Sequence, residues 1–323
     1  MTDENPWAKA RPASRSPDKR ERQRQRDESP SAPAARVPPR TPTASVWPQR
    51  DADAHAQSSA DDGGDEHPQN RLPRPNQREA RWYGVNACLA AFARRPDDVR
   101  KVYLTEARLG VLKPVLAWCV QHKLGYRVVE TDDLDRLTGS RHHEGVCIDM
   151  LRQPALSLAD LLAGVPAAPK RSLLLWLDGV GNPHNLGALL RSAAHFEADG
   201  VIVPTASSLD LSGAAARVAE GGAEAVPMAR VCDDAAAFDE LRAAGFAIAA
   251  TVPRGGTDLY AAELPRRLVL VFGAEGEGMS EALIKAADFS VGIPGSGIVE
   301  SLNIAASAAV VMGEYWRQQR HQL

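Results

Sequence analysis

Five short segments of uninterrupted apolar character constrain the fold of this chain more than any other feature. They are SLLLWLD (172–178), GVIVP (200–204), FAIAAT (246–251), LVLVFG (268–273) and FSVGIP (289–294). Strands that are apolar at successive positions, rather than at every second one, are typical of a parallel sheet covered on both faces. Helical patterns alternate with these strands at 186–197, 211–220, 234–244, 280–287 and 302–318. Residues 172–323 therefore predict a doubly wound α/β domain.

A second, smaller α/β pattern occupies residues 81–151. Its elements, in order, are a helical pattern (Val85, Leu89, Phe92), a strand (99–105), a helix (111–122), a strand (126–130) and two further elements, DDLDRLTG and GVCIDML. This alternation predicts a small α/β sandwich. Residues 152–171, which contain three prolines and a glycine, predict a linker between the two domains.

Residues 1–80 have a composition that excludes a packed core. They hold 12 of the 23 prolines, 27 of the 79 charged side chains and only four residues of the Met, Leu, Ile, Val and Phe class. Such a segment cannot bury enough apolar surface to offset the entropy lost on ordering. We therefore expect a disordered charged tail, followed by a body large enough to form a core.

The charges of this tail are segregated into blocks. Residues 9–50 carry 11 basic and four acidic side chains, whereas residues 51–66 carry six acidic and no basic ones. A basic arm such as KRERQRQR (19–26) is attracted to phosphate backbones by counterion release. A solvated linker without a partner explains the same pattern equally well. If the substrate is RNA, we expect the arm to help capture it.

Several classes of protein are excluded by simple counts. No apolar run approaches the roughly 18–20 residues of a membrane span, and the first residues contain no apolar stretch like that of a signal peptide. We therefore expect a cytoplasmic protein that does not bind a membrane. The four cysteines have no CxxC spacing, which argues against a disulfide framework and a zinc site.

One cluster, RHHEGV (141–146), contains three side chains that can ligate metals. His142, His143 and Glu144 are adjacent in sequence, however, and therefore point in different directions. An ordinary polar turn, or an exposed loop that touches a substrate, explains this segment better. We expect no bound metal.

Nucleotide-binding signatures are absent from the loops that follow the strands. The loop LDGVGNPHNLGALLR (177–191) contains Gly179 and Gly181 but has no glycine at position 184, so it fails the GxGxxG pattern. No GxxxxGK[ST] segment occurs anywhere in the chain. The usual dinucleotide fingerprint and a phosphate-binding loop for ATP or GTP are thereby excluded.

This first loop nevertheless carries polar residues at the edge where ligands bind in such sheets. Asp178 ends the strand, and Asn185 opens a helix that continues through Arg191. Asn185 has a simple alternative role as a helix N-cap. Arg191 lies off the centre of the helix's apolar stripe, so a solvated side chain explains it as well.

Two more loops follow buried strands. FGAEGEGMS (272–280) has three glycines interleaved with Glu275 and Glu277, and glycine lets a backbone approach a ligand closely. IPGSGIVESLN (293–303) delivers Glu300, Ser301 and Asn303 to the start of the last helix. Each loop alone is a weak indication of a site.

Together and in this order, the three loops resemble the motifs of the SpoU/TrmH family of RNA ribose 2′-O-methyltransferases, part of the SPOUT superfamily. NPHNLGALLR is similar to the first motif, VFGAEGEGMS to the second and IPGSGIVESLN to the third. The resemblance covers about residues 172–318, and residues 81–151 resemble the small RNA-binding domain that often precedes the catalytic one. AARVAEGGAEAVP (215–227), with the C-terminal GEYWRQ, is particularly similar to the YfiF-like subgroup, which has a long charged N-terminal tail.

The resemblance implies a fold that composition does not show. It implies a C-terminal α/β domain whose last segment passes through a loop to form a deep trefoil knot, preceded by a small L30e-like α/β domain and the tail. It also implies S-adenosyl-L-methionine as the cofactor, held mainly by backbone groups of the knot loops. The partners it implies are ribosomal or transfer RNA and a second copy of the chain, in an obligate homodimer.

The resemblance also assigns residues. The catalytic positions it implies are Asn185, Arg191, Glu275, Ser301 and Asn303, and the cofactor-binding positions are Gly273, Ile293 and Leu302. The implied reaction is an in-line displacement in which a ribose hydroxyl attacks the sulfonium methyl group.

The family reading gives the arginine the initiating role in this reaction. A guanidinium hardly deprotonates, so we expect Arg191 to hold the hydroxyl and a nearby phosphate, with a phosphate oxygen able to take the proton. Glu275 and Asn185 would position Arg191 or the ribose. Hydrogen bonds from the other two catalytic positions would shape the methyl-transfer site.

Two residues depart from the family pattern. Gly295 stands where the third motif usually has methionine, and Glu220 stands where a small residue often precedes the Gly-Ala pair. Neither departure removes an implied catalytic group. The leading hypothesis is thus an active methyltransferase. The alternatives are a catalytically inactive RNA-binding or ribosome-associated protein with the same fold, and a knotted methyltransferase that modifies a base or a substrate other than RNA.

Overall fold

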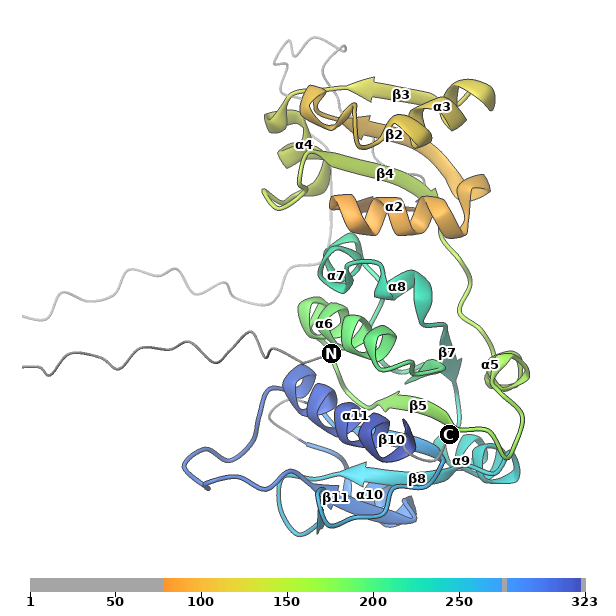
Figure 1. Ribbon diagram of the computed structural model, residues 1–323, viewed down its shortest axis with the longest axis vertical. Helices are drawn as coiled ribbons and strands as arrows, with labels where there is room; N and C mark the ends of the chain where they lie inside the picture. Colours follow the sequence, from red (N-terminus) through yellow and green to blue (C-terminus); the bar gives the residue numbers. More distant parts are fainter. Residues whose placement is uncertain (1–77, 275–277, 321–323) are drawn as a thin grey trace, which may run out of the picture. The chain divides into compact units, whose positions relative to one another are not determined.

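The computed structural model describes residues 78–274 and 278–320. The predicted disordered tail, residues 1–80, lies outside these residues except for its last three. Within the described residues, the chain forms a four-stranded sheet and a seven-stranded sheet (Figure 1). None of the helices described there has both the length and the apolar content that a membrane crossing requires.

The four-stranded sheet belongs to the smaller domain. Its elements are β1 (Glu79–Tyr83), α2 (Val85–Arg94), η2 (Pro96–Asp98), β2 (Val99–Leu104), η3 (Glu106–Arg108), α3 (Lys113–Gln121), β3 (Gly125–Val128), α4 (Thr131–Thr138) and β4 (Val146–Leu151). The strand order is β1-β4-β2-β3, in which only β2 and β3 run parallel. The alternation predicted from the sequence is present, and β1 is an additional strand.

The seven-stranded sheet belongs to the larger domain and is parallel between all neighbours. Its elements are β5 (Ser172–Leu177), α6 (Pro183–His195), β6 (Gly200–Pro204), α7 (Gly213–Ala219), α8 (Gly222–Ala225), β7 (Met228–Val231), α9 (Asp234–Ala243), β8 (Ala247–Thr251), β9 (Thr257–Asp258), β10 (Arg267–Phe272), α10 (Glu281–Ala286), β11 (Phe289–Gly292) and α11 (Ile304–Arg320). The expected α/β fold with a parallel sheet is confirmed.

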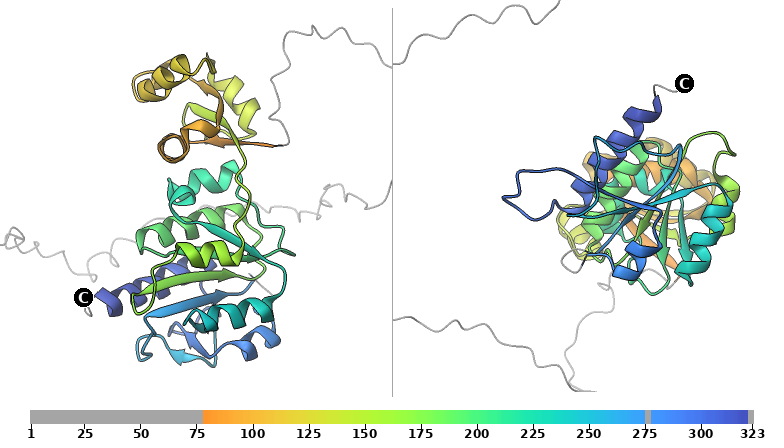
Figure 2. Two further views of the ribbon diagram at one scale, coloured as in Figure 1. Left: turned by 90° about the vertical axis from the view of Figure 1, so that its right-hand side faces the viewer. Right: turned by 90° about the horizontal axis from the view of Figure 1, so that it is seen from below.

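Both faces of this sheet are buried, which explains the uninterrupted apolar strands. In β5, Leu173, Leu175 and Leu177 pack with helices α6, α7 and α11, whereas Leu174 and Trp176 pack with α5 (Leu158–Gly164), α9 and α10. Successive side chains of a strand point to opposite faces, so a strand between two helical layers must be apolar throughout. Figure 2 shows the helices on both sides of the sheet.

The segment predicted as a linker, residues 152–171, contains structure of its own. Ser157 caps α5 by accepting a hydrogen bond from the backbone N–H of Asp160. Leu161 of this helix is buried against the large sheet, and Leu156 pairs with Ala229 of β7 in an isolated parallel bridge. This part of the connection is therefore fixed to the larger domain.

The strand order places three loops at one edge of the sheet. The order is β7-β6-β5-β10-β8-β11-β9, so β10 is inserted between β5 and β8, which precede it in the chain. The carboxyl ends of parallel strands meet at the same edge, where ligands of such sheets bind. The backbone N–H of Asp178 donates to the carbonyl of Phe272 (2.8 Å) and joins the ends of β5 and β10.

Helix α7 of the larger domain packs closely against β1 of the small domain and against its own neighbour α6. A Cβ atom on Gly213 would collide with the carbonyl of Arg81 in β1, and one on Gly187 of α6 would collide with the carbonyl of Ala215. Ala216 of α7 is part of the small domain's apolar core. The two domains therefore share α7 as a common packing element.

Candidate active site

Asn185 lies within helix α6 and is not its N-cap. Asn182 is the N-cap of α6, and its side chain accepts a hydrogen bond from the backbone N–H of His184 (2.9 Å). The alternative in which Asn185 merely caps the helix is therefore wrong. Because Asn182 has taken that role, the Asn185 amide is available for a contact elsewhere.

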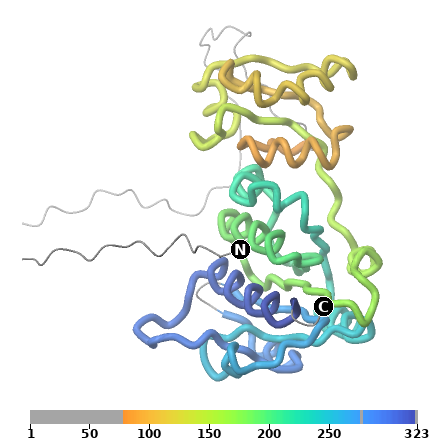
Figure 3. Tube along the Cα trace, viewed as in Figure 1, coloured from red at the N-terminus to blue at the C-terminus, as the bar shows by residue number. Residues whose placement is uncertain are grey.

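That contact is with the third loop, 118 residues further along the chain. The side-chain Nδ2 of Asn303 donates to Oδ1 of Asn185 (3.2 Å). The Asn303 side-chain oxygen accepts from the backbone N–H of Ala305 (3.0 Å), at the start of α11. One asparagine thus starts the last helix and links it to α6. In Figure 3 the chain between β11 and α11 extends as a long loop before it reaches this point.

Arg191 lies on α6 with its guanidinium in solvent. Its side chain is 64 % exposed, and Nη1 lies 3.9 Å from Oε1 of Glu220. The residues of the predicted apolar stripe, in contrast, are fully buried: Leu186, Leu189, Leu190 and Ala193. The side chain is therefore accessible to an anion, as expected from its position beside the stripe, and it has an acidic neighbour that the sequence pattern did not predict.

The second loop begins directly after β10, and two of its residues that the structure describes are paired. Ala274 and Gly278 exchange two backbone hydrogen bonds of 3.0 Å. A Cβ atom on Gly273 would lie 2.5 Å from the backbone N of Met279, so only glycine fits there. Glu275, predicted to be catalytic, lies outside the described residues.

The first and second loops touch. Gly179 has a φ of +73°, a region that favours glycine, and a Cβ atom there would lie 2.7 Å from Cβ of Ala274. Burial raises the pKa of the nearby Asp178 carboxyl above its ordinary value. The two loops therefore form one continuous surface at the ends of β5 and β10.

The remaining predicted residues line the third loop. Ile293 is half-buried and packs against the core, whereas Ser301 is exposed and Leu302 is 48 % exposed. Ile298 and Val299 of the same loop are 88 % and 68 % exposed. The loop thus presents apolar side chains to solvent next to the point where Asn303 meets Asn185.

The loop RHHEGV has a structural role. His143 is buried, and its Nε2 pairs with Asp135 (3.1 Å) while Nδ1 accepts from the backbone N–H of Gly145 (2.9 Å). Glu144 instead accepts from the backbone N–H of Val85 at the start of α2 (2.9 Å). Among the described residues, no group of three or more His, Cys, Asp or Glu side chains could hold a metal ion.

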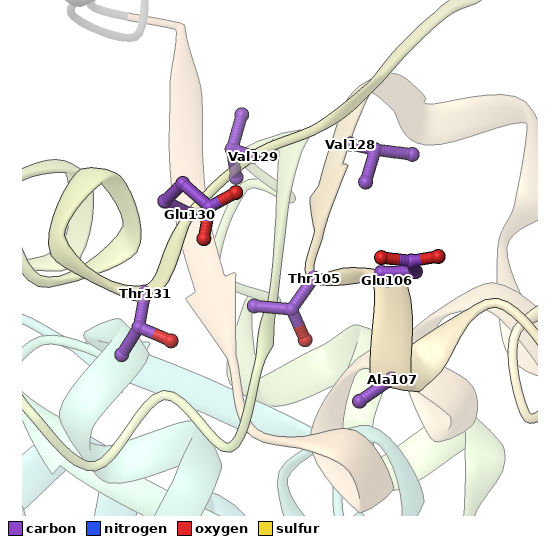
Figure 4. Close-up of a pocket in the computed structure, with 7 residues that line it drawn as sticks. All are labelled: Thr105, Glu106, Ala107, Val128, Val129, Glu130 and Thr131. Atoms are coloured by element: carbon purple, nitrogen blue, oxygen red, sulfur yellow. The ribbon is translucent and has the colours of Figure 1, made fainter.

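A separate pocket of about 480 Å³ lies in the small domain, beside the carboxyl ends of β2 and β3 (Figure 4). Its lining residues are Thr105, Glu106, Ala107, Val128, Val129, Glu130 and Thr131. None of the residues predicted for catalysis or cofactor binding is among them. The candidate active site is therefore the loop surface of the larger domain.

Two family models match the chain. The model described as the SpoU rRNA Methylase family matches residues 172–313. The model described as RNA 2′-O ribose methyltransferase substrate binding matches residues 82–151. The first match spans all three loops of the candidate site.

Individual relatives agree with these matches. The chain is 36 % identical over 249 residues to the uncharacterized tRNA/rRNA methyltransferase YfiF of Escherichia coli O157:H7, which covers 77 % of this chain and 71 % of that protein. It is 35 % identical over 239 residues to the 23S rRNA (guanosine-2′-O-)-methyltransferase RlmB of Nitrosomonas europaea, covering 73 % and 90 %.

Solved structures share the fold. The crystal structure of an RNA 2′-O ribose methyltransferase has a TM-score of 0.62 and 25 % identity, covering 76 % of this chain and 90 % of that one. An rRNA methyltransferase from Sinorhizobium meliloti, crystallised with AdoMet, also has a TM-score of 0.62, with 24 % identity and coverage of 76 % and 88 %.

Proposed function

Because the chain belongs to the SpoU rRNA methylase family, we propose that it is an S-adenosylmethionine-dependent RNA methyltransferase that modifies a ribose 2′-hydroxyl of ribosomal or transfer RNA. The observation that carries this proposal is the contact between Asn185 and Asn303. It joins the first and third loops at the edge where the second loop also ends. Such a substrate agrees with the cytoplasmic location expected from the sequence.

We propose that Arg191 holds the RNA. Its guanidinium is exposed and permanently charged, and it can donate to a phosphate and to the ribose hydroxyl at once. The hydroxyl proton then has a nearby phosphate oxygen to accept it, since the arginine itself does not deprotonate. Asn185 and Asn303 would hold the ribose by their amide groups, with Ser301 beside them.

The cofactor, when bound, supplies the methyl group as an electrophile. The residues present fit such a ligand, which combines an aromatic ring with charged and polar groups. Gly273 brings backbone close to backbone at the end of β10, and Leu302 offers an exposed apolar side chain on the third loop. We propose that these residues, with Ile293, hold it, and that Glu275 belongs to the same site.

We further propose the deep trefoil knot of the family and an L30e-like fold for the small domain. Two features support the knot. Strand β10 is inserted between β5 and β8, and Asn303, at the end of the third loop, reaches back to the first loop. In a deep trefoil knot the C-terminal segment has to return to loops formed earlier in the chain, and the contact of Asn303 with Asn185 is such a return.

We also propose that the protein is a homodimer. The exposed apolar residues of the third loop, Ile298, Val299 and Leu302, lie together in sequence next to the candidate site. Exposed apolar patches of this kind mark surfaces that another protein covers. A second copy of the chain would cover them and enclose the site.

Calorimetric titration of S-adenosylmethionine tests the proposal, followed by methylation of total RNA from cells that lack the protein. We expect saturable binding at one site per subunit, and a methyl group that remains on the ribose after the base is removed. A methyl group lost with the base would favour the base-modifying alternative. Absence of cofactor binding, with and without RNA, would favour an inactive RNA-binding protein.

Removal of the charged tail should weaken RNA binding in a salt-dependent way. Residues 9–50 have a net charge of +7, from 11 basic and four acidic side chains, and each phosphate contact contributes about 0.7 to the slope of log K against log salt for single strands. We expect a chain of residues 78–323 to bind RNA more weakly at low salt, with a shallower slope and unchanged cofactor affinity. Equal slopes for the two chains would identify the tail as a linker.

A further inference from the structure

The turn between α7 and α8 contains an acidic residue in a strained conformation. Glu220 ends α7 with φ 52° and ψ 36°, in the left-handed region. Residues other than glycine occupy that region at an energetic cost and persist there only when their surroundings determine it. The contacts of Glu220 therefore indicate what this conformation achieves.

The two carboxylate oxygens of Glu220 face different domains. Oε2 accepts a hydrogen bond from Nδ2 of Asn86, in the first turn of α2 in the small domain. Oε1 lies 3.9 Å from Nη1 of Arg191 on α6. A single side chain thus connects the domain that resembles an RNA-binding module to the arginine of the candidate site.

The backbone around Glu220 is tightly held from both sides. A Cβ atom on Gly222 would lie 2.6 Å from the carbonyl O of Leu190 and 3.0 Å from Cα of Arg191. On the other side, a Cβ atom on Gly221 would lie 3.0 Å from Cβ of Ala90 in α2. The turn therefore has little freedom to shift relative to either Arg191 or the small domain.

From this geometry we infer that Glu220 is a positioning residue for Arg191 and that Asn86 anchors it from the small domain. The carboxylate attracts one end of the guanidinium and thereby favours orientations in which the remaining donors of the fork point away from Glu220. Because Arg191 is otherwise a long exposed side chain, restricting its rotamers lowers the entropy lost when it takes up the orientation that the transition state of methyl transfer requires. This inference rests on the proposed function.

The test is Glu220→Gln, which keeps the length of the side chain, its backbone strain and an oxygen that can accept from Asn86. Only the charge that attracts Arg191 is lost. Exposed ion pairs are weak, so we expect the single-turnover rate of methyl transfer to fall about two- to fivefold. The affinities for S-adenosylmethionine and RNA should stay the same.

Asn86→Ala provides the second arm. We expect it to lower the same rate constant by a similar factor, because the carboxylate loses its anchor, and to have no further effect when Glu220 is already Gln. Asp239→Asn is the matched control, since Asp239 is 83 % exposed and lies 3.7 Å from Arg242 on α9. Its rate should equal that of the unaltered protein.

The outcomes separate this inference from the proposed function. If the unaltered protein transfers no methyl group to RNA, the proposed function is wrong. If it is active and Glu220→Gln has the same single-turnover rate, the positioning role is wrong. A weaker RNA affinity with an unchanged rate would also overturn it, because Glu220 would then only support the docking of the small domain.

Discussion

Replacing Arg191 with alanine should abolish methyl transfer while leaving the protein folded. Removal of one donor that stabilises charge in a transition state costs about 100- to 1000-fold in rate, and we expect a loss of at least about 100-fold. Folding should be preserved because the side chain is 64 % exposed and its pair with Glu220 spans 3.9 Å. Pairs of this kind contribute at most about 1 kcal/mol.

The measurement is the single-turnover rate of methyl incorporation into RNA, together with calorimetric titration of S-adenosylmethionine and RNA. Cofactor affinity should change by less than about twofold. RNA affinity should fall only by the contribution that a single contact with a phosphate makes to binding. Lys285→Ala is a suitable control, because Lys285 is an exposed cation on α10 that pairs with Glu281 (3.0 Å). Methylation by Arg191→Ala at the normal rate would show that the assignment of this arginine is wrong.

Replacing Gly273 with alanine should produce the other large effect, on cofactor binding. The added Cβ would lie 2.5 Å from the backbone N and 2.8 Å from Cα of Met279. Backbone atoms cannot move away as a flexible side chain can, so the backbone pairing of Ala274 with Gly278 must re-form. We expect the affinity for S-adenosylmethionine to fall by at least about tenfold, about 1.4 kcal/mol.

Gly164→Ala is the matched control for this loop variant. Gly164 ends α5, and a Cβ atom there would have nothing within 4 Å. Both variants should be titrated with the cofactor, and their thermal unfolding should be compared to separate loop damage from global unfolding. Normal affinity in a folded Gly273→Ala protein would exclude this glycine from the cofactor site.

Elements with a long or strongly apolar pattern were predicted from the sequence. The buried strand β5 and the helices α6, α9 and α11 are found within a few residues of their expected bounds. Elements with mixed or short patterns were missed. Strand β1 alternates charged Glu79 and Arg81 with buried Ala80 and Trp82, and α8 has only four residues. Strand β1 does have the period-2 alternation of a half-buried strand, but it begins within residues 1–80, whose composition predicted disorder. The four residues of α8 make barely one helical turn, which is too short for a periodic pattern.

The same division applies to the candidate site. The resemblance to the family motifs implied that Asn185 and Asn303 belong to one site, and their side chains form a hydrogen bond. The alternative role considered for Asn185 placed the helix N-cap three residues after the observed cap, Asn182. Asparagine at either position suits the start of a helix, so the sequence did not distinguish the two. The approach of Glu220 to Arg191 depends on how α7 packs against α6, which local sequence does not encode.

The close packing of α7 against the small domain limits which segments could be exchanged in a chimeric protein. Gly213 abuts β1, and Arg95 of the small domain donates to Glu224 at 2.8 and 2.9 Å. A chimera that imported another substrate-recognition module at residues 79–151 alone would place foreign side chains against this surface. Exchange of the module therefore has to include residues 213–224, so the unit of modular exchange is discontinuous in sequence.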